Sequence, residues 1–190
     1  MTEALAALLA EVRACRACPL AHGPRPVVQA GPSARILIIS QAPGSAVQAS
    51  GVPFDDPSGD RLRDWTGLGM AAFYDPGSVA LMPMGFCYPG KGPSADLPPR
   101  RECAPLWHQR LRALMPDVRL TLLVGHHAIR HYLPAAPSMA EAVRRWAEQP
   151  GGLFPLPHPS WRSSIWMRRH PWFEADVLPA LRSRVAAALG

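Results

Sequence analysis

Four cysteines stand in a pattern that is typical of a metal site. Cys15 and Cys18 form a C-x2-C pair, and Cys87 and Cys103 follow in the middle of the chain, each beside a predicted loop. One free cysteine is usually an inert core residue, but four cysteines near turns, with one close pair, are better explained as a single site. Four thiolates suit either zinc or an iron–sulfur cluster, and the spacing alone does not choose between them.

A polar loop follows the apolar segment 36–39, where S-Q-A-P-G at 40–44 ends a predicted strand. Proline removes a backbone donor and glycine admits unusual dihedral angles, so the strand stops there. In α/β sheets the crevice outside the carboxyl ends of the strands is where ligands bind. This loop and its continuation supply an amide, an aromatic ring and two carboxylates, namely Gln41, Phe54, Asp55 and Asp56. Asp-Asp-Pro-Ser-Gly at 55–59 is also ordinary turn chemistry, which is the alternative for the two aspartates.

A third group of candidates follows the predicted strand 153–156. His158 begins an H-P-S sequence, and the next thirteen residues, WRSSIWMRRHPWF, interleave arginine with tryptophan. Basic and aromatic residues in alternation favour contact with nucleic acid, although a solvated face is the alternative. The candidate DNA-binding residues are Trp161, Arg162, Arg168 and Arg169.

The elements that must position these groups alternate between strands and helices. Buried strands are predicted at 36–39, 78–84, 119–124 and 153–156. Helices are predicted at 2–14, 60–68, 104–115, 126–133, 138–149 and 172–188, with N-caps at Thr2 and Ser138. This order predicts a three-layer α/β/α fold with a central, mostly parallel four-stranded sheet. The 190 residues, 48% of them hydrophobic, are enough for a single domain spanning 1–190.

The composition favours a polyanionic partner. The chain has a formal net charge of +6, and basic residues in excess are a natural match for phosphates. No run approaches the ~18 apolar residues of a membrane span, and no segment resembles a signal peptide. We therefore expect a cytoplasmic, monomeric protein without a membrane partner.

Taken together, these pieces resemble the uracil-DNA glycosylase superfamily, most closely its iron–sulfur branch, often called family 4. That branch typically has a G-E-A-P-G loop followed by G-x-P-F, and this chain has S-Q-A-P-G at 40–44 and G-V-P-F at 51–54. The branch closes its site with H-P-S, which is found here at 158–160. Its four cluster cysteines come in the same order and with similar spacing, and the resemblance covers nearly the whole chain.

The resemblance implies a [4Fe-4S] cluster with a structural role, held by Cys15, Cys18, Cys87 and Cys103. It also implies a pocket that receives a nucleotide extruded from DNA and cleaves its N-glycosidic bond. In that pocket His158 would donate to the leaving base and Phe54 would stack on it. Trp161 and Arg162 would lie beside the gap left in the DNA. The remaining substrate-binding positions would be Ala42, Pro43, Gly44, Pro83 and Ser160.

Two positions depart from the family pattern. The family's loop glutamate, which helps to position water, is Gln41 here, and an amide carries no charge to stabilise a sugar cation. The family's asparagine, four residues before the third cluster cysteine, is Pro83, which has no side-chain donor. Asp55 or Asp56 could supply the missing carboxylate.

These observations predict an enzyme that removes uracil or another deaminated or damaged base from DNA. The alternative is an iron–sulfur DNA-binding module of the same fold with little or no glycosylase activity, which the two departures favour. A phosphate or nucleotide hydrolase that uses the aspartates with a metal is a weaker idea, because the sequence has no phosphate-cradling signature.

Overall fold

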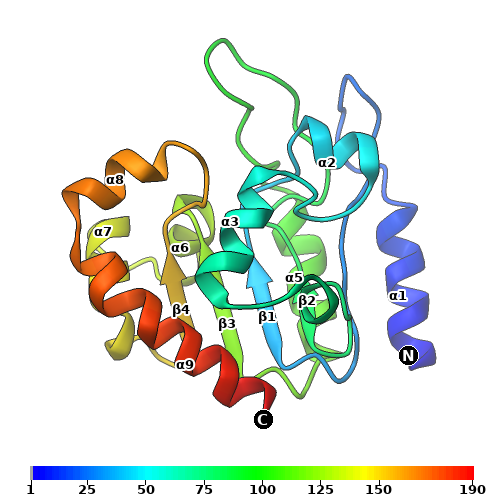
Figure 1. Ribbon diagram of the computed structural model, residues 1–190. Coiled ribbons are helices and arrows are strands. Elements are labelled where there is room, and N and C mark those ends of the chain that lie inside the picture. Colours follow the sequence, from blue (N-terminus) through cyan, green and yellow to red (C-terminus); the bar gives the residue numbers. More distant parts are fainter. Residues whose placement is uncertain (1) are drawn as a thin grey trace.

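The computed structural model describes residues 2–190 and has a four-stranded sheet with helices on both faces (Figure 1). The strands are β1 (Ile36–Ile39), β2 (Val79–Leu81), β3 (Leu120–Val124) and β4 (Leu153–Leu156). Their order in the sheet is β2-β1-β3-β4, and all three pairs are parallel. The predicted α/β fold with a central four-stranded sheet is therefore confirmed.

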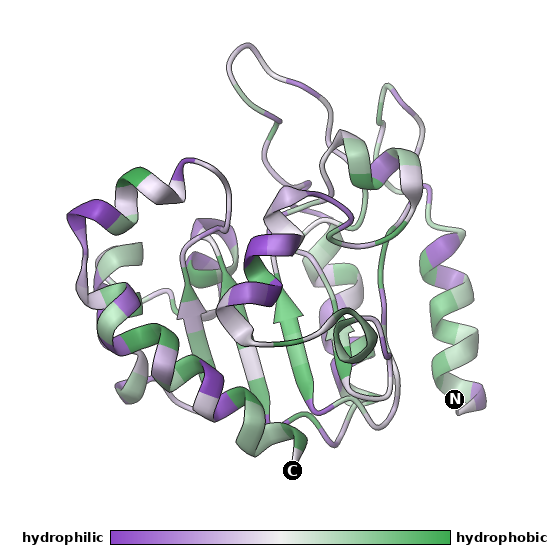
Figure 2. Cartoon of the chain, viewed as in Figure 1, coloured by the Kyte–Doolittle hydropathy of each residue, from purple (hydrophilic) through white to green (hydrophobic). Residues whose placement is uncertain are grey.

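The strands form where the sequence has short apolar runs because both faces of the sheet are covered. All four residues of β1 are fully buried, and Figure 2 shows β1 in the green of hydrophobic residues. Ile36 of β1 lies in register with Val79 of β2 on one side and with Leu120 of β3 on the other. Pro155 lies within β4, which pairs only with β3, and an edge strand tolerates the missing donor of proline.

Helices occupy two layers around the sheet. In Figure 1, α3 and α9 lie in front of the strands, α5 and α6 lie behind them, and α1 packs beside α5. The α-helices are α1 (Glu3–Arg13), α2 (Ser45–Ser50), α3 (Pro57–Thr66), α4 (Met70–Phe73), α5 (Cys103–Ala113), α6 (His126–Tyr132), α7 (Met139–Arg144), α8 (Ser163–Arg169) and α9 (Leu178–Leu189). A 3-10 turn, η1 (Trp146–Glu148), follows α7, and a π-helical segment, η2 (Phe173–Val177), leads into α9. No helix within residues 2–190 is both long and apolar enough to cross a bilayer.

Several predicted boundaries are wrong. The helix predicted at 60–68 begins earlier, at Pro57, because Asp56 caps it and proline is well suited to the first helical position. The strand predicted at 78–84 is confined to β2, although Met84 N–H still donates to the carbonyl of Ser40 at 2.8 Å. The helix predicted at 138–149 divides into α7 and η1, and that at 172–188 divides into η2 and α9.

Three helices, α2, α4 and α8, were not predicted. Each is too short to have a clear apolar repeat: α2 buries only Val47 among its six residues, and α8 buries only Ser163 among its seven. The predicted N-caps are confirmed, because the side chain of Thr2 accepts from Leu5 N–H and that of Ser138 accepts from Glu141 N–H.

Candidate active site

The candidate active site lies at the carboxyl edge of the sheet. The chain leaves β1 toward β2 on one side, while β3 lies on the other side of β1. The strand order therefore reverses at β1, and ligands bind at such a point in open α/β sheets. The loops that follow β1, β2 and β4 all begin at this edge, because the strands are parallel, and they bring distant parts of the sequence together.

One cavity at this edge joins most of the predicted substrate-binding residues. Its walls come from the loop after β1, the start of α3, the segment after β2 and the H-P-S turn after β4. Seven of its lining residues were predicted from the sequence: Ala42, Pro43, Gly44, Phe54, Asp56, Pro83 and His158. The others are Val27, Ser40, Val47, Pro53, Ser58 and Leu81. The cavity is thus mainly apolar, with a few polar groups facing it, which is typical of a small-molecule or base pocket.

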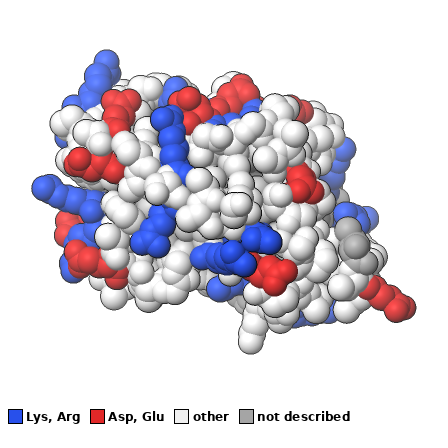
Figure 3. Space-filling model, turned by 60° about the horizontal axis from the view of Figure 1, so that its bottom comes forward, with Lys and Arg blue, Asp and Glu red and all other residues white. Residues whose placement is uncertain are grey.

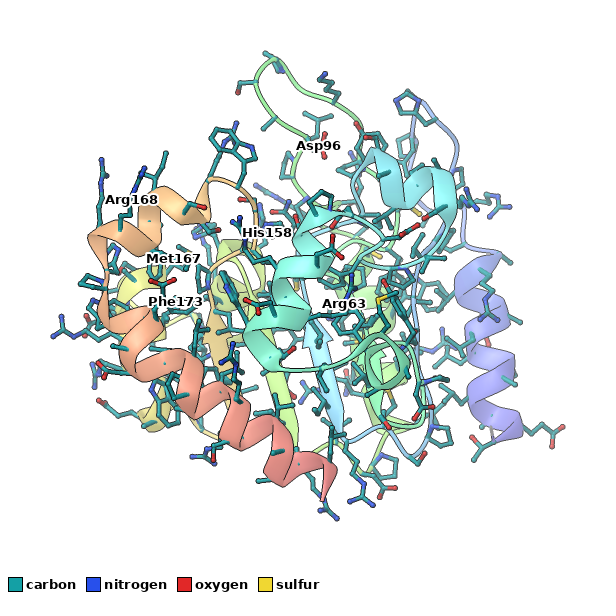
Figure 4. All side chains as sticks on the ribbon, in the orientation of Figure 1. Arg63, Asp96, His158, Met167, Arg168 and Phe173 are labelled. Atoms are coloured by element: carbon teal, nitrogen blue, oxygen red, sulfur yellow. The ribbon has the colours of Figure 1, made fainter. Side chains whose placement is uncertain are left out.

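Among residues 2–190, His158 is the only imidazole that lines this cavity, and its side chain lies beside α3 (Figure 4). Burial lowers the pKa of His158, while the nearby carboxylate of Asp56 acts in the opposite direction and His127 lowers it further. The H-P-S turn is held by Ser163, whose hydroxyl donates to the carbonyl of His158. A Cβ on Gly125 would lie 3.2 Å from the Cβ of His158, so a glycine after β3 makes room for this imidazole.

The two aspartates have different positions. Asp56 lines the cavity, and its Oδ1 accepts from Gly59 N–H at 2.9 Å, which caps α3. Asp55 is exposed and does not line the cavity. Asp56 therefore both caps α3 and faces the cavity, so its role in the turn does not exclude a role in the site.

Two further predicted residues are close in sequence to residues that line the cavity, but they do not line it themselves. Gln41 is half-buried, and its carbonyl accepts from Gly85 N–H at 2.9 Å, which ties the loop after β1 to the segment after β2. Ser160 N–H donates to the carbonyl of His158 at 2.9 Å, and its own carbonyl accepts from Arg61. Both residues thus hold the cavity walls through their backbone.

Phe54 has a backbone conformation that residues other than glycine rarely adopt. Its φ is +57°, and it is the only non-glycine residue within 2–190 with a positive φ. Its ring packs edge-on against Phe73, and its carbonyl accepts from the hydroxyl of Tyr74. Gly59 allows this arrangement, because a Cβ there would lie 1.9 Å from the carbonyl oxygen of Phe54. Residues held in such conformations cluster at functional sites.

Sequence reasoning missed His108, which supports the cavity from behind. Its Nε2 lies 3.0 Å from the carbonyl oxygen of Pro83 and its Nδ1 lies 2.6 Å from the hydroxyl of Tyr132. Because a carbonyl only accepts, Nε2 carries the proton and Nδ1 accepts from the phenol. Burial lowers the pKa of His108 to about 4, so this imidazole is neutral at pH 7. The helical spacing of His108 with Leu111, at i and i+3, is the sequence signal that places it on the buried face of α5.

The four cysteines line a second cavity, between the end of α1 and the start of α5. Cys103 is buried and the other three are half-buried. Burial, together with the neighbouring thiols, raises the pKa of Cys87 to about 11 and that of Cys103 to about 12. Phe86 N–H donates to Cys103 Sγ at 3.3 Å. The structure thus brings together residues that are far apart in the sequence, in the combination that the spacing predicted.

Within residues 2–190 no group of three or more His, Cys, Asp or Glu side chains is placed to hold a single metal ion. The thiols instead line a shared cavity. An all-cysteine donor set fits the chemistry of an iron–sulfur cluster, in which the thiolates bind several iron atoms rather than one ion.

The residues predicted to contact DNA lie beside the H-P-S turn and on α8. Trp161 is 69% exposed, and the guanidinium of Arg162 stacks over its ring. Arg168 and Arg169 are exposed on α8, and Figure 4 shows Arg168 pointing away from the sheet. On the face turned forward in Figure 3, by contrast, basic and acidic side chains are mixed. An exposed indole near a candidate base pocket, followed by exposed guanidinium groups, is suited to nucleic acid.

The fold is thus a parallel α/β sheet with an apolar pocket and a histidine at its carboxyl edge. The sequence matches the family described as the Uracil DNA glycosylase superfamily over residues 28–182. The chain therefore belongs to the Uracil DNA glycosylase superfamily, which acts on DNA, and its function is of the DNA glycosylase type.

Proposed function

We propose that the protein is a DNA repair glycosylase that hydrolyses the N-glycosidic bond of uracil, or of another deaminated or damaged base, after the nucleotide has been extruded from the duplex. The observation that carries this proposal is the single cavity lined by Phe54, Asp56 and His158. These three side chains provide a stacking wall, a negative charge and a hydrogen-bond donor, which are the groups that such a reaction needs.

His158 acts on the leaving base. When the C1′–N bond breaks, its electron pair leaves with the base and negative charge develops on a base carbonyl oxygen. A lowered pKa favours the neutral imidazole at pH 7, and a neutral imidazole still carries one N–H that can donate to the base. Such a preorganised donor in a largely buried site stabilises the transition state more than it would in water.

Asp56 supplies negative charge that Gln41 lacks. Its Oδ1 is committed to Gly59 N–H, so Oδ2 is the oxygen that orients a water or faces the sugar. Asp55 is the weaker candidate of the pair, because its carboxylate is exposed and outside the cavity.

Pro83 stands where the family has the asparagine that reads the base edge, so this pocket has no side-chain amide at that position. The neighbouring walls, Val27, Val47 and Leu81, are apolar, and the carbonyl of Pro83 is already bonded to His108. A site built without a matching polar group discriminates weakly between related bases. We therefore propose uracil as the first substrate to test, with other deaminated bases accepted alongside it.

The protein belongs, on this proposal, to the iron–sulfur branch of the superfamily. The support is the shared cavity of the four cysteines at positions 15, 18, 87 and 103. A [4Fe-4S] cluster held by them would have a structural role, because it would tie the end of α1 to the start of α5. The DNA duplex would lie across the carboxyl edge of the sheet, with Trp161 and Arg162 at the extruded nucleotide and Arg168 and Arg169 at phosphates.

The proposal is tested with the purified, cluster-loaded protein on oligonucleotides that carry uracil, hypoxanthine, xanthine or a mismatched base. Under single-turnover conditions we expect alkali-labile abasic sites to form in at least the uracil strand. A protein that binds these duplexes but forms no abasic site in any of them would support the DNA-binding module instead.

A further inference from the structure

The segment between β2 and α5 folds back on itself above the carboxyl edge of the sheet. Gly92 N–H donates to the carbonyl of Ala95 at 2.7 Å, and Leu97 N–H donates to the carbonyl of Gly90 at 2.8 Å. These bonds close a small hairpin, which Figure 1 shows in green beyond the strand ends, close to α2. Asp96 belongs to this hairpin, so its backbone is held in place.

Asp96 is exposed, and its side chain lies beside Gly44, which lines the candidate active site. The buried Tyr88, which stacks on His22, donates its hydroxyl to Asp96 Oδ1 at 3.2 Å. Asp96 Oδ2 lies 3.8 Å from the position that a Cβ on Gly44 would occupy. Among the described residues, no other atom beyond the chain neighbours of Gly44 lies within 4 Å of that position. Gly44 lines the same cavity as His158, and Figure 4 shows Asp96 on the same side of the molecule as this histidine.

The negative charge of Asp96 has no cationic partner in the structure. Across residues 2–190 no ion pair joins it to a lysine, arginine or histidine. Asp56, by comparison, is partly committed to the cap of α3. A carboxylate without a cationic partner attracts a positively charged group that comes close to it.

We propose that Asp96 is a further catalytic residue, whose carboxylate lies against the deoxyribose of the extruded nucleotide and stabilises positive charge at C1′. This inference rests on the proposed function. In the reaction the C1′–N bond breaks, its electron pair leaves with the base, and the oxygen of a water molecule bonds to C1′. The proton of that water passes to Asp96 and then to solvent. The hairpin thus adds a second carboxylate, beside Gly44, to the charge that Asp56 supplies in place of Gln41.

The test uses two duplexes that differ only in the charge of one sugar. One contains a pyrrolidine analogue of an abasic site, which is protonated at neutral pH, and the other contains a neutral tetrahydrofuran analogue. We expect the wild-type protein to prefer the cationic duplex and Asp96→Asn to lower that preference about tenfold. Tyr88→Phe, which frees the carboxylate, should lower the preference by a smaller factor. Asp117→Asn is the matched control, because Asp117 is an exposed carboxylate outside the cavity and, like Asp96, joins none of the ion pairs among the described residues, and it should keep the full preference.

An unchanged preference in Asp96→Asn would overturn the proposal, and so would a wild-type protein without any preference. A preference that is lost in Asp56→Asn but kept in Asp96→Asn would also overturn it. Because Asp96 is exposed, its replacement is expected to leave the melting temperature unchanged, which is checked in parallel. Binding of an abasic analogue needs no bond cleavage, so the result is obtained even if the wild-type protein excises no base, and the two hypotheses fail separately.

Discussion

The buried imidazole of His108 donates a hydrogen bond to the carbonyl of Pro83, across 3.0 Å, and so joins α5 to the wall of the candidate base pocket. The helix that carries His108 begins at Cys103. The ring of His108 stacks on Phe86, which is next to Cys87. The cysteine cavity and the base cavity are therefore parts of one packed unit. A disturbance of the cysteines is expected to reach the pocket through α5.

The first prediction concerns the pH dependence of stability through His108. Its pKa is lowered from 6.5 to about 4 by burial, with His131 and Arg112 acting in the same direction and the bond to Pro83 opposing them. The folded protein thus disfavours the proton that the unfolded chain binds. The stability that comes from keeping His108 neutral is therefore fully present above pH 6.5 and is lost as the pH falls toward 4. We expect this loss to lower the free energy of unfolding by about 3 kcal/mol.

His108→Gln isolates this contribution, because glutamine keeps a donor but does not titrate. Urea unfolding between pH 4 and 7 should therefore show a shallower loss of stability on acidification in the variant than in the wild-type protein. His127 and His158 remain in both proteins, so their own pH dependence cancels in the difference. Parallel stability curves would mean that His108 is not protected from protonation in the folded protein.

The second prediction concerns the cluster. Anaerobically purified protein should be brown and contain about four iron and four sulfide per chain, as expected for one [4Fe-4S] cluster. Cys18→Ser and Cys87→Ser should each lower the iron content and the melting temperature together, because the cluster would join α1 to α5. A colourless protein with one zinc and no iron would contradict the prediction.

The third prediction concerns DNA binding by α8. If Arg168 and Arg169 each contact a phosphate, replacing both by alanine should reduce the slope of log affinity against log salt by about 1.8, at about 0.9 for each contact on duplex DNA. Arg184→Ala with Arg119→Ala is the control for a general loss of positive charge. Equal salt slopes in the α8 variant and the wild-type protein would place the interface elsewhere.

The sequence was sufficient for the sheet but not for every group at its edge. The strands at 36–39 and 153–156 are short apolar runs, the first followed by the S-Q-A-P-G loop and the second by Pro157, so their positions follow from the local sequence. His158 and Phe54 were predictable because each stands in a short motif. The position of Asp96 beside Gly44 was not predictable, because it depends on the tertiary contacts of its hairpin with Tyr88 and Gly44. The burial of His108 could be inferred from its helical spacing with Leu111, but its bond to Pro83 could not, because the two residues are brought together only by the fold.

The most direct test of the account is the single-turnover rate of uracil excision by the wild-type protein and by His158→Ala, measured with the affinity for the same duplex. Loss of one donor to the developing negative charge should lower the rate about 10²–10³-fold while the affinity stays within about twofold. The exposed His131→Ala serves as the control and should match the wild-type rate. An excision rate that is unchanged in His158→Ala would contradict the account.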